Sequence, residues 1–406
     1  MPNKIFNEQN KSNKITEDAT AKEPNYFSSL SYKYKKASHI IYIILAASFV
    51  FTLLFNSSLL TYKNLNYLFR DLNAAAEVAA DNYNSISYTN DEMRIVKSFR
   101  GGIITASSSD MTIYTATGRK TLHLNENFIS PEIATSKKYA IVYELGGNKY
   151  GVYNSFSKVG GEKLDYAISY VSVADNGWFA VVSKDAEHSS VVYLYDDDLQ
   201  LRNTYYFASS RVFLVDINDN ASRVAIFRTV SDMDKYSTEL MLCEPGKEKS
   251  IFDVKISSGM IYGGGFLENG NIQAVCTDGY YLIDQSNGKI SKSYNFDGRM
   301  SNRICVTDEG CVVSLSDNSG IVKNTILVFN KKGELVYNKA VDNGILDMEY
   351  NDGYIFINQA DIILKIDTKR DNIESTKTVE KGSDIIVYDG NNILLCCQTK
   401  AKYIEI

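Results

Sequence analysis

The residue types that most often perform acid–base or nucleophilic chemistry are sparse in this sequence. Its three histidines, His39, His123 and His188, are far apart, and none belongs to an H-E-x-x-H or G-x-S-x-G motif. Residues 216–222, DINDNAS, place oxygens at the first, third and fifth positions of a calcium loop. That segment lacks glycine at the sixth position and has Phe227 at the twelfth, so we interpret it as a turn. The sequence therefore predicts no catalytic residue, no metal site and no cofactor.

Charged and aromatic residues in long loops are the stronger candidates, and their chemistry is binding. The longest loops span residues 183–190, 229–238 and 316–324, and shorter connections span 209–211 and 298–303. Loops on a rigid scaffold commonly carry binding residues, although a solvated loop has the same composition. We predict that a ligand or partner contacts the following residues of these loops: Asp185, Glu187, His188, Arg211, Asp232, Asp234, Lys235, Tyr236, Arg299 and Arg303.

The scaffold that would position these loops is a repeated β unit. From residue 84 onward, runs rich in Val, Ile, Tyr and Phe alternate with Asp, Asn and Gly, as strands alternate with turns. Turns that contain an acidic or amide residue and Gly recur, for example at 175–177, 268–270, 308–310 and 351–353. Four strands in roughly 40 residues are typical of a β-propeller blade. The sequence therefore predicts an all-β propeller.

The number of blades follows from the last repeat. Seven complete repeats precede residues 384–406, which contain only three strand-like runs. An incomplete sheet would leave an exposed edge, and the strand-like segment 85–89 can supply the missing strand and close the ring. We therefore predict an eight-bladed β-propeller over residues 84–406. A seven-bladed ring is the alternative if the irregular region 210–300 contains one blade fewer.

An uncharged segment before the repeats predicts one transmembrane helix. Residues 37–62 carry no charge if His39 is neutral, and residues 39–60 would rise about 33 Å as a helix. A bilayer's hydrocarbon core is roughly 30 Å thick, so this segment can contact lipid along its whole length. It is longer than the core of a cleaved signal peptide, which favours an uncleaved signal-anchor. Residues 1–36 are predicted to be a disordered tail and residues 63–83 a helical stalk.

Charge on the two sides of this segment predicts its orientation. Four lysines lie in the twenty residues before His39, against one lysine and one arginine in the twenty after Leu60. This asymmetry places the N-terminus in the cytoplasm and the C-terminal domain outside the cell membrane. Residues 84–406 contain 34 Lys and Arg against 42 Asp and Glu without a basic stripe, so nucleic acid is not a predicted partner. Leu and Ala recur along the stalk at helical spacing, so a homodimer through it is an alternative to a monomer.

Six cysteines are too few and too scattered for a disulfide scaffold, and none forms a C-x-x-C motif. Cys305 and Cys311 flank a predicted turn and could face each other. A disulfide there is one interpretation, and buried free thiols are the simpler one.

The strand and turn texture of residues 84–406 resembles the repeat propellers of the quinoprotein-like and WD-type superfamilies. The sequence has no Trp-Asp dipeptide and Trp178 is its only tryptophan, so it departs from the recurring tryptophan of the quinoproteins. The resemblance therefore does not imply a bound quinone. The whole layout, an anchor followed by a propeller, also resembles an uncharacterised family of single-pass membrane proteins from clostridial-type bacteria, which implies no activity.

Two functions remain compatible with the sequence. The first is a membrane-tethered, non-catalytic binding or scaffold module for a protein or glycan of the cell envelope, favoured by the predicted anchor and the missing catalytic motifs. The second is a hydrolase or lyase of envelope polymers. The second function requires acidic, basic and arginine side chains that converge in the axial funnel of the ring.

Overall fold

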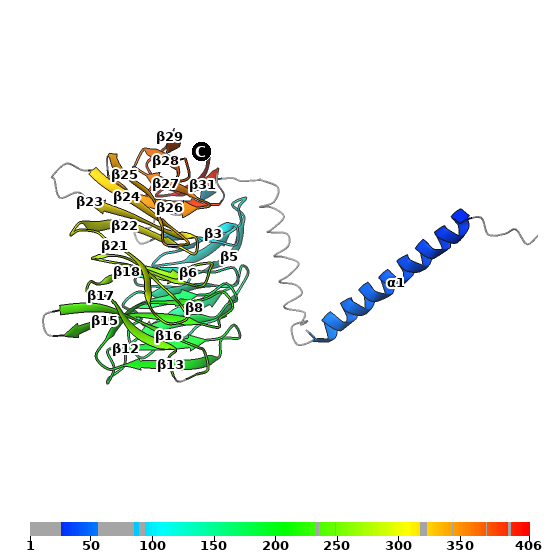
Figure 1. Cartoon of the computed structure of the whole chain (residues 1–406), viewed down its shortest axis with the longest axis horizontal. Coiled ribbons are helices and arrows are strands. Elements are labelled where there is room, and N and C mark those ends of the chain that lie inside the picture. The colour runs from blue at the N-terminus through cyan, green and yellow to red at the C-terminus, as the bar shows by residue number, and fades with distance from the viewer. Residues whose placement is uncertain are drawn as a thin grey trace, which may run out of the picture. The chain divides into compact units, whose positions relative to one another are not determined.

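The computed structural model describes residues 26–55, 85–88, 94–232, 235–247, 249–316, 323–342, 344–370, 372–388 and 391–406. The chain divides into two compact units, Met1–Phe69 and Arg70–Ile406, and each is described by itself. The first contains one described helix, and the second contains the β structure (Figure 1).

Helix α1 (Tyr26–Phe55) is the described part of the first unit. It includes residues 26–36, which the sequence analysis assigned to a disordered tail, so that boundary is corrected to Tyr26. Lys and Tyr are tolerated in an exposed helix, so the polar composition of this segment concealed its helical conformation. Within the described residues, no helix is long and apolar enough to cross a membrane. The end of the predicted transmembrane helix, 56–62, and the predicted stalk, 63–83, lie outside the described residues.

The β structure consists of eight four-stranded antiparallel sheets, which we number as blades in chain order. In blades 1 to 4 the strands run from the innermost to the outermost in sequence order. Their bounds are β2 (Ile95–Phe99), β3 (Gly102–Ala106), β4 (Met111–Tyr114), β5 (Lys120–Leu124); β6 (Pro131–Thr135), β7 (Ala140–Glu144), β8 (Tyr150–Tyr153), β9 (Lys158–Gly160); β10 (Tyr170–Val173), β11 (Phe179–Ser183), β12 (Ser190–Tyr195), β13 (Leu201–Phe207); β14 (Arg211–Ile217), β15 (Val224–Asp232), β16 (Lys235–Cys243) and β17 (Phe252–Ser257).

Blades 5 to 7 repeat this order, and blade 8 takes its fourth strand from the start of the unit. Their bounds are β18 (Ile261–Phe266), β19 (Ile272–Cys276), β20 (Gly279–Ile283), β21 (Ile290–Asn295); β22 (Met300–Thr307), β23 (Gly310–Ser316), β24 (Lys323–Asn330), β25 (Leu335–Asp342); β26 (Asp347–Asn351), β27 (Tyr354–Asn358), β28 (Ile362–Asp367), β29 (Asn372–Thr378); and β30 (Asp384–Val387), β31 (Asn392–Cys396), β32 (Lys400–Glu405), β1 (Ile86–Ser87).

Burial explains why the middle strands read as continuous apolar runs. Every residue of β11 is buried, because side chains that alternate along the strand pack against a different neighbouring blade on each face. Ala180 and Val182 point towards blade 4, whereas Phe179 and Val181 face blade 2. The fourth strands, such as β21 and β29, are largely exposed. These fourth strands form the polar outer rim of the propeller.

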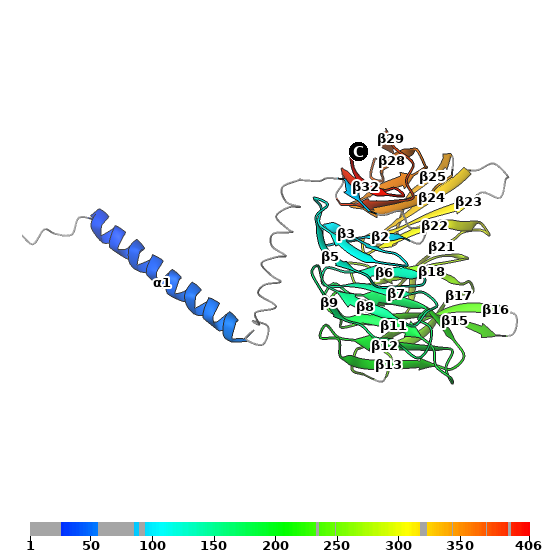
Figure 2. The same cartoon turned by 180° about the vertical axis from the view of Figure 1, so that it is seen from behind.

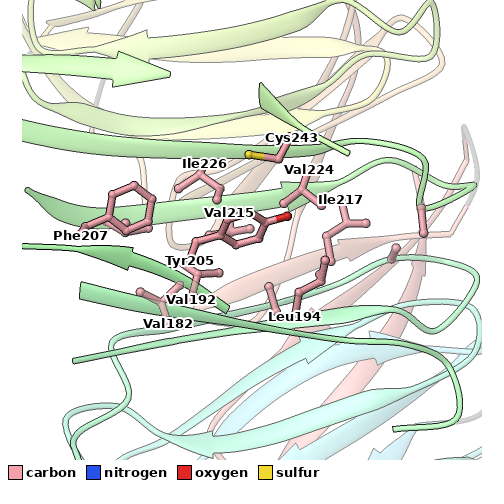
Figure 3. Packing of buried hydrophobic residues seen from close by; sticks show 14 residues of the cluster. Val182, Val192, Leu194, Tyr205, Phe207, Val215, Ile217, Val224, Ile226 and Cys243 are labelled. Atoms are coloured by element: carbon pink, nitrogen blue, oxygen red, sulfur yellow. The ribbon is translucent and has the colours of Figure 1, made fainter. Parts of the chain in front are cut away.

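The hydrophobic core lies between the blades, and its arrangement shows that the ring is closed. Figure 3 shows the cluster between blades 3 and 4, where Val192 and Tyr205 face Val215 and Ile226. Among the described residues there are eight such clusters, one at each interface between successive blades, including one between blades 8 and 1. Eight blades in an open row would share only seven interfaces. In Figures 1 and 2 the red strands of blade 8 lie beside the cyan strands of blade 1.

Strand β1 closes the ring as predicted. Ile86 pairs with Ala401 and Ser87 with Lys400, so the segment before blade 1 completes the sheet of blade 8. The Tyr88 hydroxyl donates to the carbonyl of Cys397, 309 residues away in the chain, at 2.6 Å. Of the predicted strand 85–89, residue 89 lies outside the described residues. The eight-bladed prediction is confirmed and the seven-bladed alternative is wrong.

The cysteines are free thiols. Cys305 and Cys311 lie on the paired strands β22 and β23, but Cys305 is opposite Val312 and Cys311 is opposite Val306. All six cysteines are free, and four are fully buried among apolar side chains. The disulfide interpretation is therefore wrong for this structure.

Candidate functional site

The propeller has two ends with different connections. The first strands of successive blades contact one another and line a central channel. At one end, which we call the loop end, lie the connections between blades and the loops between second and third strands. The other end, the turn end, carries the turns that join first to second and third to fourth strands. Residues of both ends line cavities, so each end is a candidate site.

A large cavity lies at the turn end of the channel and is acidic. It has a volume of about 1150 Å³ and is lined by blades 1 and 3 to 6. Lys97 of β2 is the basic residue in its lining. The carboxylates that line it come from four successive blades: Asp175, Asp216, Asp219, Glu268 and Asp308.

Asp216 is held at the wall of this cavity by glycines in the neighbouring blade. Its Oδ2 accepts a hydrogen bond from the backbone N–H of Phe266 at 2.7 Å. A Cβ at Gly265 would lie 2.6 Å from the same oxygen, so only glycine lets the carboxylate reach that backbone. Burial raises the pKa of Asp216 to about 6, although hydrogen bonds from Phe266 and Ile217 act in the opposite direction. Asp216 can therefore change charge in mildly acidic conditions.

A second group of carboxylates lines the channel where blades 7, 8 and 1 meet. Asp347, Glu349 and Asp384 share a pocket of about 170 Å³ with Lys97. Burial, followed by the charge of Asp347, raises the pKa of Glu349 to about 7. Burial also raises the pKa of Asp347. The Cys305 thiol donates to Glu349 Oε2 at 3.5 Å. A carboxyl with a pKa near neutrality can accept or donate a proton under physiological conditions.

The predicted site residues of blade 3 lie together in the loop between β11 and β12. The imidazole of His188 lies 2.8 Å from Asp185 Oδ2 through Nδ1, and its ring packs on Tyr206 at a centroid distance of 4.9 Å. Backbone N–H groups of Glu187 and His188 also donate to Asp185 Oδ1. These hydrogen bonds outweigh the burial of the carboxyl and lower the pKa of Asp185. The loop is therefore a self-contained turn whose main acidic group is already occupied.

The predicted residues of blade 4 lie on the hairpin formed by β15 and β16 and at the start of β14. Lys235 and Tyr236 are exposed on β16, and Asp232 is opposite Lys235 in the strand register. Asp234 lies outside the described residues. Arg211 is exposed and lines a pocket of about 440 Å³ at the loop end.

The two remaining arginines bind backbone carbonyls. Arg299 donates through Nε to the carbonyl of Phe296 at 3.2 Å. Arg303 donates through Nε to the carbonyl of Leu346 at 2.8 Å, which links blade 6 to the connection before blade 7. Arg303 also donates through Nη1 to the carbonyl of Asn302 at 3.1 Å, so both arginines fasten connections at the loop end.

The ten predicted residues do not converge on one point. Contacts join Asp185, Glu187 and His188, whereas the other described members are distributed over blades 4 to 6. The sequence reasoning missed the carboxylates of the channel. The signal that could have revealed them is an acidic residue inside an otherwise apolar first strand, as at Asp216 and Glu349. No group of three or more His, Cys, Asp or Glu side chains in the described ranges is placed to hold a metal ion.

Solved structures with this fold cover nearly all of the propeller. BamB from Moraxella catarrhalis is 11% identical with a TM-score of 0.54, and the match covers 80% of this chain and 99% of BamB. The C-terminal WD40 domain of Sif2 is 12% identical with a TM-score of 0.58, over 80% and 99% of the two chains. Sqt1 from Chaetomium thermophilum, bound to the N-terminus of ribosomal protein L10, is 9% identical with a TM-score of 0.57, over 80% and 100%. At these identities the likeness establishes the fold alone.

No curated protein matches the chain significantly. A family defined by sequence matches residues 76–406, which include all eight blades and exclude α1. The matched region includes the closing strand β1 and blade 8, so it contains the whole closed ring. This protein therefore belongs to the family of unknown function DUF5711.

Proposed function

We propose that this chain is a membrane-tethered, extracytoplasmic β-propeller that binds a protein partner in the cell envelope. The observation that carries the proposal is the apolar surface of the loop end. Large apolar side chains there are between 37% and 81% exposed: Ile129, Leu145, Tyr166, Phe213, Tyr236, Met260 and Met300. They come from blades 2 to 6 and the connections between them. Exposed apolar side chains that gather on one surface are typical of protein interaction sites.

The comparison with Sqt1 supports a protein as the partner rather than a glycan. In that structure a ring of the same fold holds the N-terminus of another protein. A closed ring is suited to this role, because its loops are fixed by eight hydrophobic interfaces and lose little entropy when they bind.

The proposed tether is the uncharged sequence 37–62, which extends beyond the described part of α1. Ile40, Ile41 and Ile43 are each at least 50% exposed on α1, so their apolar surface is available to lipid. The lysines that precede this segment favour a cytoplasmic N-terminus and a propeller outside the membrane. A homodimer through residues 63–83 remains a further prediction.

Chemical crosslinking in intact producing cells tests this function. The tagged full chain treated with a membrane-impermeant crosslinker should be recovered from the membrane fraction with one defined protein. Substituting exposed apolar residues of the loop end, Met300→Glu together with Tyr236→Glu, should reduce recovery about tenfold, because charges would replace apolar contacts.

The matched control is Ile290→Glu with Ile373→Glu, which places charges on exposed apolar residues outside the loop end. That control should leave recovery unchanged. Equal loss in both double variants, or no protein with any crosslinker, contradicts protein binding. Recovery only with a membrane-permeant crosslinker contradicts the extracytoplasmic location while leaving binding intact.

The channel carboxylates favour one alternative, an envelope-polymer hydrolase or lyase with its site in the axial funnel. Glu349 and Asp347 have raised pKa values beside Lys97, as an acid–base pair would require. If this function holds, the full chain should cleave soluble envelope polysaccharide, and Asp347→Asn should reduce the release of new chain ends at least about a hundredfold. Cleavage that is absent from the wild-type protein, or unchanged in the variant, contradicts this alternative.

A further inference from the structure

The pocket beside Arg211 presents exposed apolar surface at the loop end. Its volume of about 440 Å³ lies between blades 2, 3 and 4 at the loop end. Ligand pockets in proteins commonly enclose roughly 300–1,000 Å³. Leu145 and Phe213 line it and are 45% and 37% exposed, whereas the lining residue Ile168 is fully buried in the core between blades 2 and 3. An apolar group that entered would cover surface that water now contacts, which is favourable.

Hydrogen bonds hold the walls of this pocket in place. The Ser183 hydroxyl donates to the carbonyl of Ala167 at 2.9 Å, which joins β11 to the connection before blade 3. Gly146 and Ile168 are joined by a backbone hydrogen bond of 2.9 Å. The Ser190 hydroxyl accepts from the backbone N–H of Val212 at 2.9 Å, which fixes the start of β14 against blade 3. The pocket is therefore formed before any partner arrives.

The charge of the pocket is opposite to that of the rest of the propeller. Lys184 and Arg211 are its ionisable lining residues, and both are exposed. Neither makes a side-chain hydrogen bond or ion pair to any described residue. The carboxylate closest in sequence, Asp185, is bound by His188 and by backbone N–H groups. By contrast, the turn-end cavity contains five carboxylates and one lysine, and the whole chain carries a net charge of −6.

We propose that this pocket binds a peptide segment of the partner protein in which a large apolar side chain is next to an aspartate or glutamate. The apolar side chain packs against the exposed surfaces of Leu145 and Phe213, and the carboxylate pairs with Arg211 or Lys184. We choose an acidic, apolar peptide as the occupant because of charge complementarity: two unpaired cations at the rim of an apolar pocket match such a segment. This inference rests on the proposed protein-binding function and specifies its site and its ligand chemistry.

Arrays of short synthetic peptides test the proposal with the full chain as the probe protein. Each peptide places Leu or Phe next to Asp or Glu, next to Asn or Gln, or next to Lys. The wild-type chain should retain the acidic peptides about tenfold better than the lysine peptides. Lys184→Glu with Arg211→Glu should reverse that preference, because the charges at the rim are inverted. Replacing Leu or Phe by Ser in the peptides should abolish retention.

The matched control is Lys332→Glu, which inverts an exposed charge in the turn between β24 and β25, at the turn end and outside the pocket lining, and should leave the preference unchanged. Thermal unfolding of each variant verifies that the fold is intact, and Arg211→Gln provides a milder second variant. A wild-type chain without preference for acidic peptides, or a double variant that keeps it, overturns the inference. If crosslinking in cells still recovers a partner in the double variant, only this site is wrong. If no partner is recovered in any variant, the proposed function is wrong as well.

Discussion

Replacing Ile86 by Asp should destabilise the propeller more than any surface substitution. Ile86 is fully buried in the cluster that joins blades 8 and 1, and it pairs with Ala401 in the closing strand β1. A buried, unpaired carboxylate costs several kcal/mol, and the loss of apolar contacts adds to that cost. We expect the free energy of unfolding to fall by about 3–5 kcal/mol, with a lower melting temperature. Protease should also cleave the chain faster in blades 8 and 1, where the ring closes.

The control for this prediction is one residue away. Ser87 is exposed in the same two-residue strand, so Ser87→Asp adds the same charge without burial. Its melting temperature should stay close to that of the wild type. Equal melting temperatures for Ile86→Asp and the wild type would show that β1 contributes nothing to closure.

We expect Ile86→Asp to have a large effect because β1 joins the start of the β structure to its last blade. Blade 8 contributes three strands from the end of the chain, and β1 contributes the fourth from the start of the β structure. Tyr388 of the last blade also donates to the carbonyl of Gly102 in blade 1 at 3.2 Å. Without β1, the edge of β32 would lose its partner and the interface of blades 8 and 1 would lose Ile86 and Tyr88.

The ring could be predicted from the sequence because burial on both faces leaves a simple signature. The second and third strands of each blade are covered by two neighbours, so they read as short apolar runs that recur with turns between them, as in β11 and β12. The number of blades was harder, because blade 4 has the long hairpin of β15 and β16 and blade 5 contains consecutive glycines. The incomplete last repeat decided it, since the eighth blade is completed only when the segment before blade 1 supplies its fourth strand.

The candidate site could not be predicted to the same extent, because only the closed ring brings side chains from distant parts of the sequence together. Asp216 and Glu349 are 133 positions apart in numbering and lie on different blades, and only the channel places both on one axis. Loop length instead predicted a site in the loop containing His188 and in the long hairpin. These lie on blades 3 and 4, outside the channel. An acidic residue in a strand expected to be apolar carries information that a charged residue in a loop does not, because burial makes the former costly.

The pH dependence of stability should reveal the charge state of Glu349. The folded protein raises the pKa of this carboxyl from 4.5 to about 7, through burial and the nearby charges of Asp347 and Asp384, while Lys97 acts in the opposite direction. Folding therefore takes up a proton between these two pH values. The contribution of this group to stability is most favourable below the unfolded pKa and is lost as pH rises through the folded pKa of about 7. Above that pH, Glu349 destabilises the fold by an amount of the order of 1–3 kcal/mol.

Glu349→Gln should remove this penalty, because glutamine has a similar shape, stays neutral and can still accept from the Cys305 thiol. We expect the variant to melt at a higher temperature than the wild type at pH 8.5 and at nearly the same temperature at pH 5. Glu187→Gln, in an exposed loop, is the control and should give no pH-dependent difference. Parallel melting curves for the wild type and Glu349→Gln across this range would mean that the channel holds Glu349 charged at no cost. In that case the acidic channel would be solvated like an ordinary surface, and the acid–base alternative for this protein would lose its principal support.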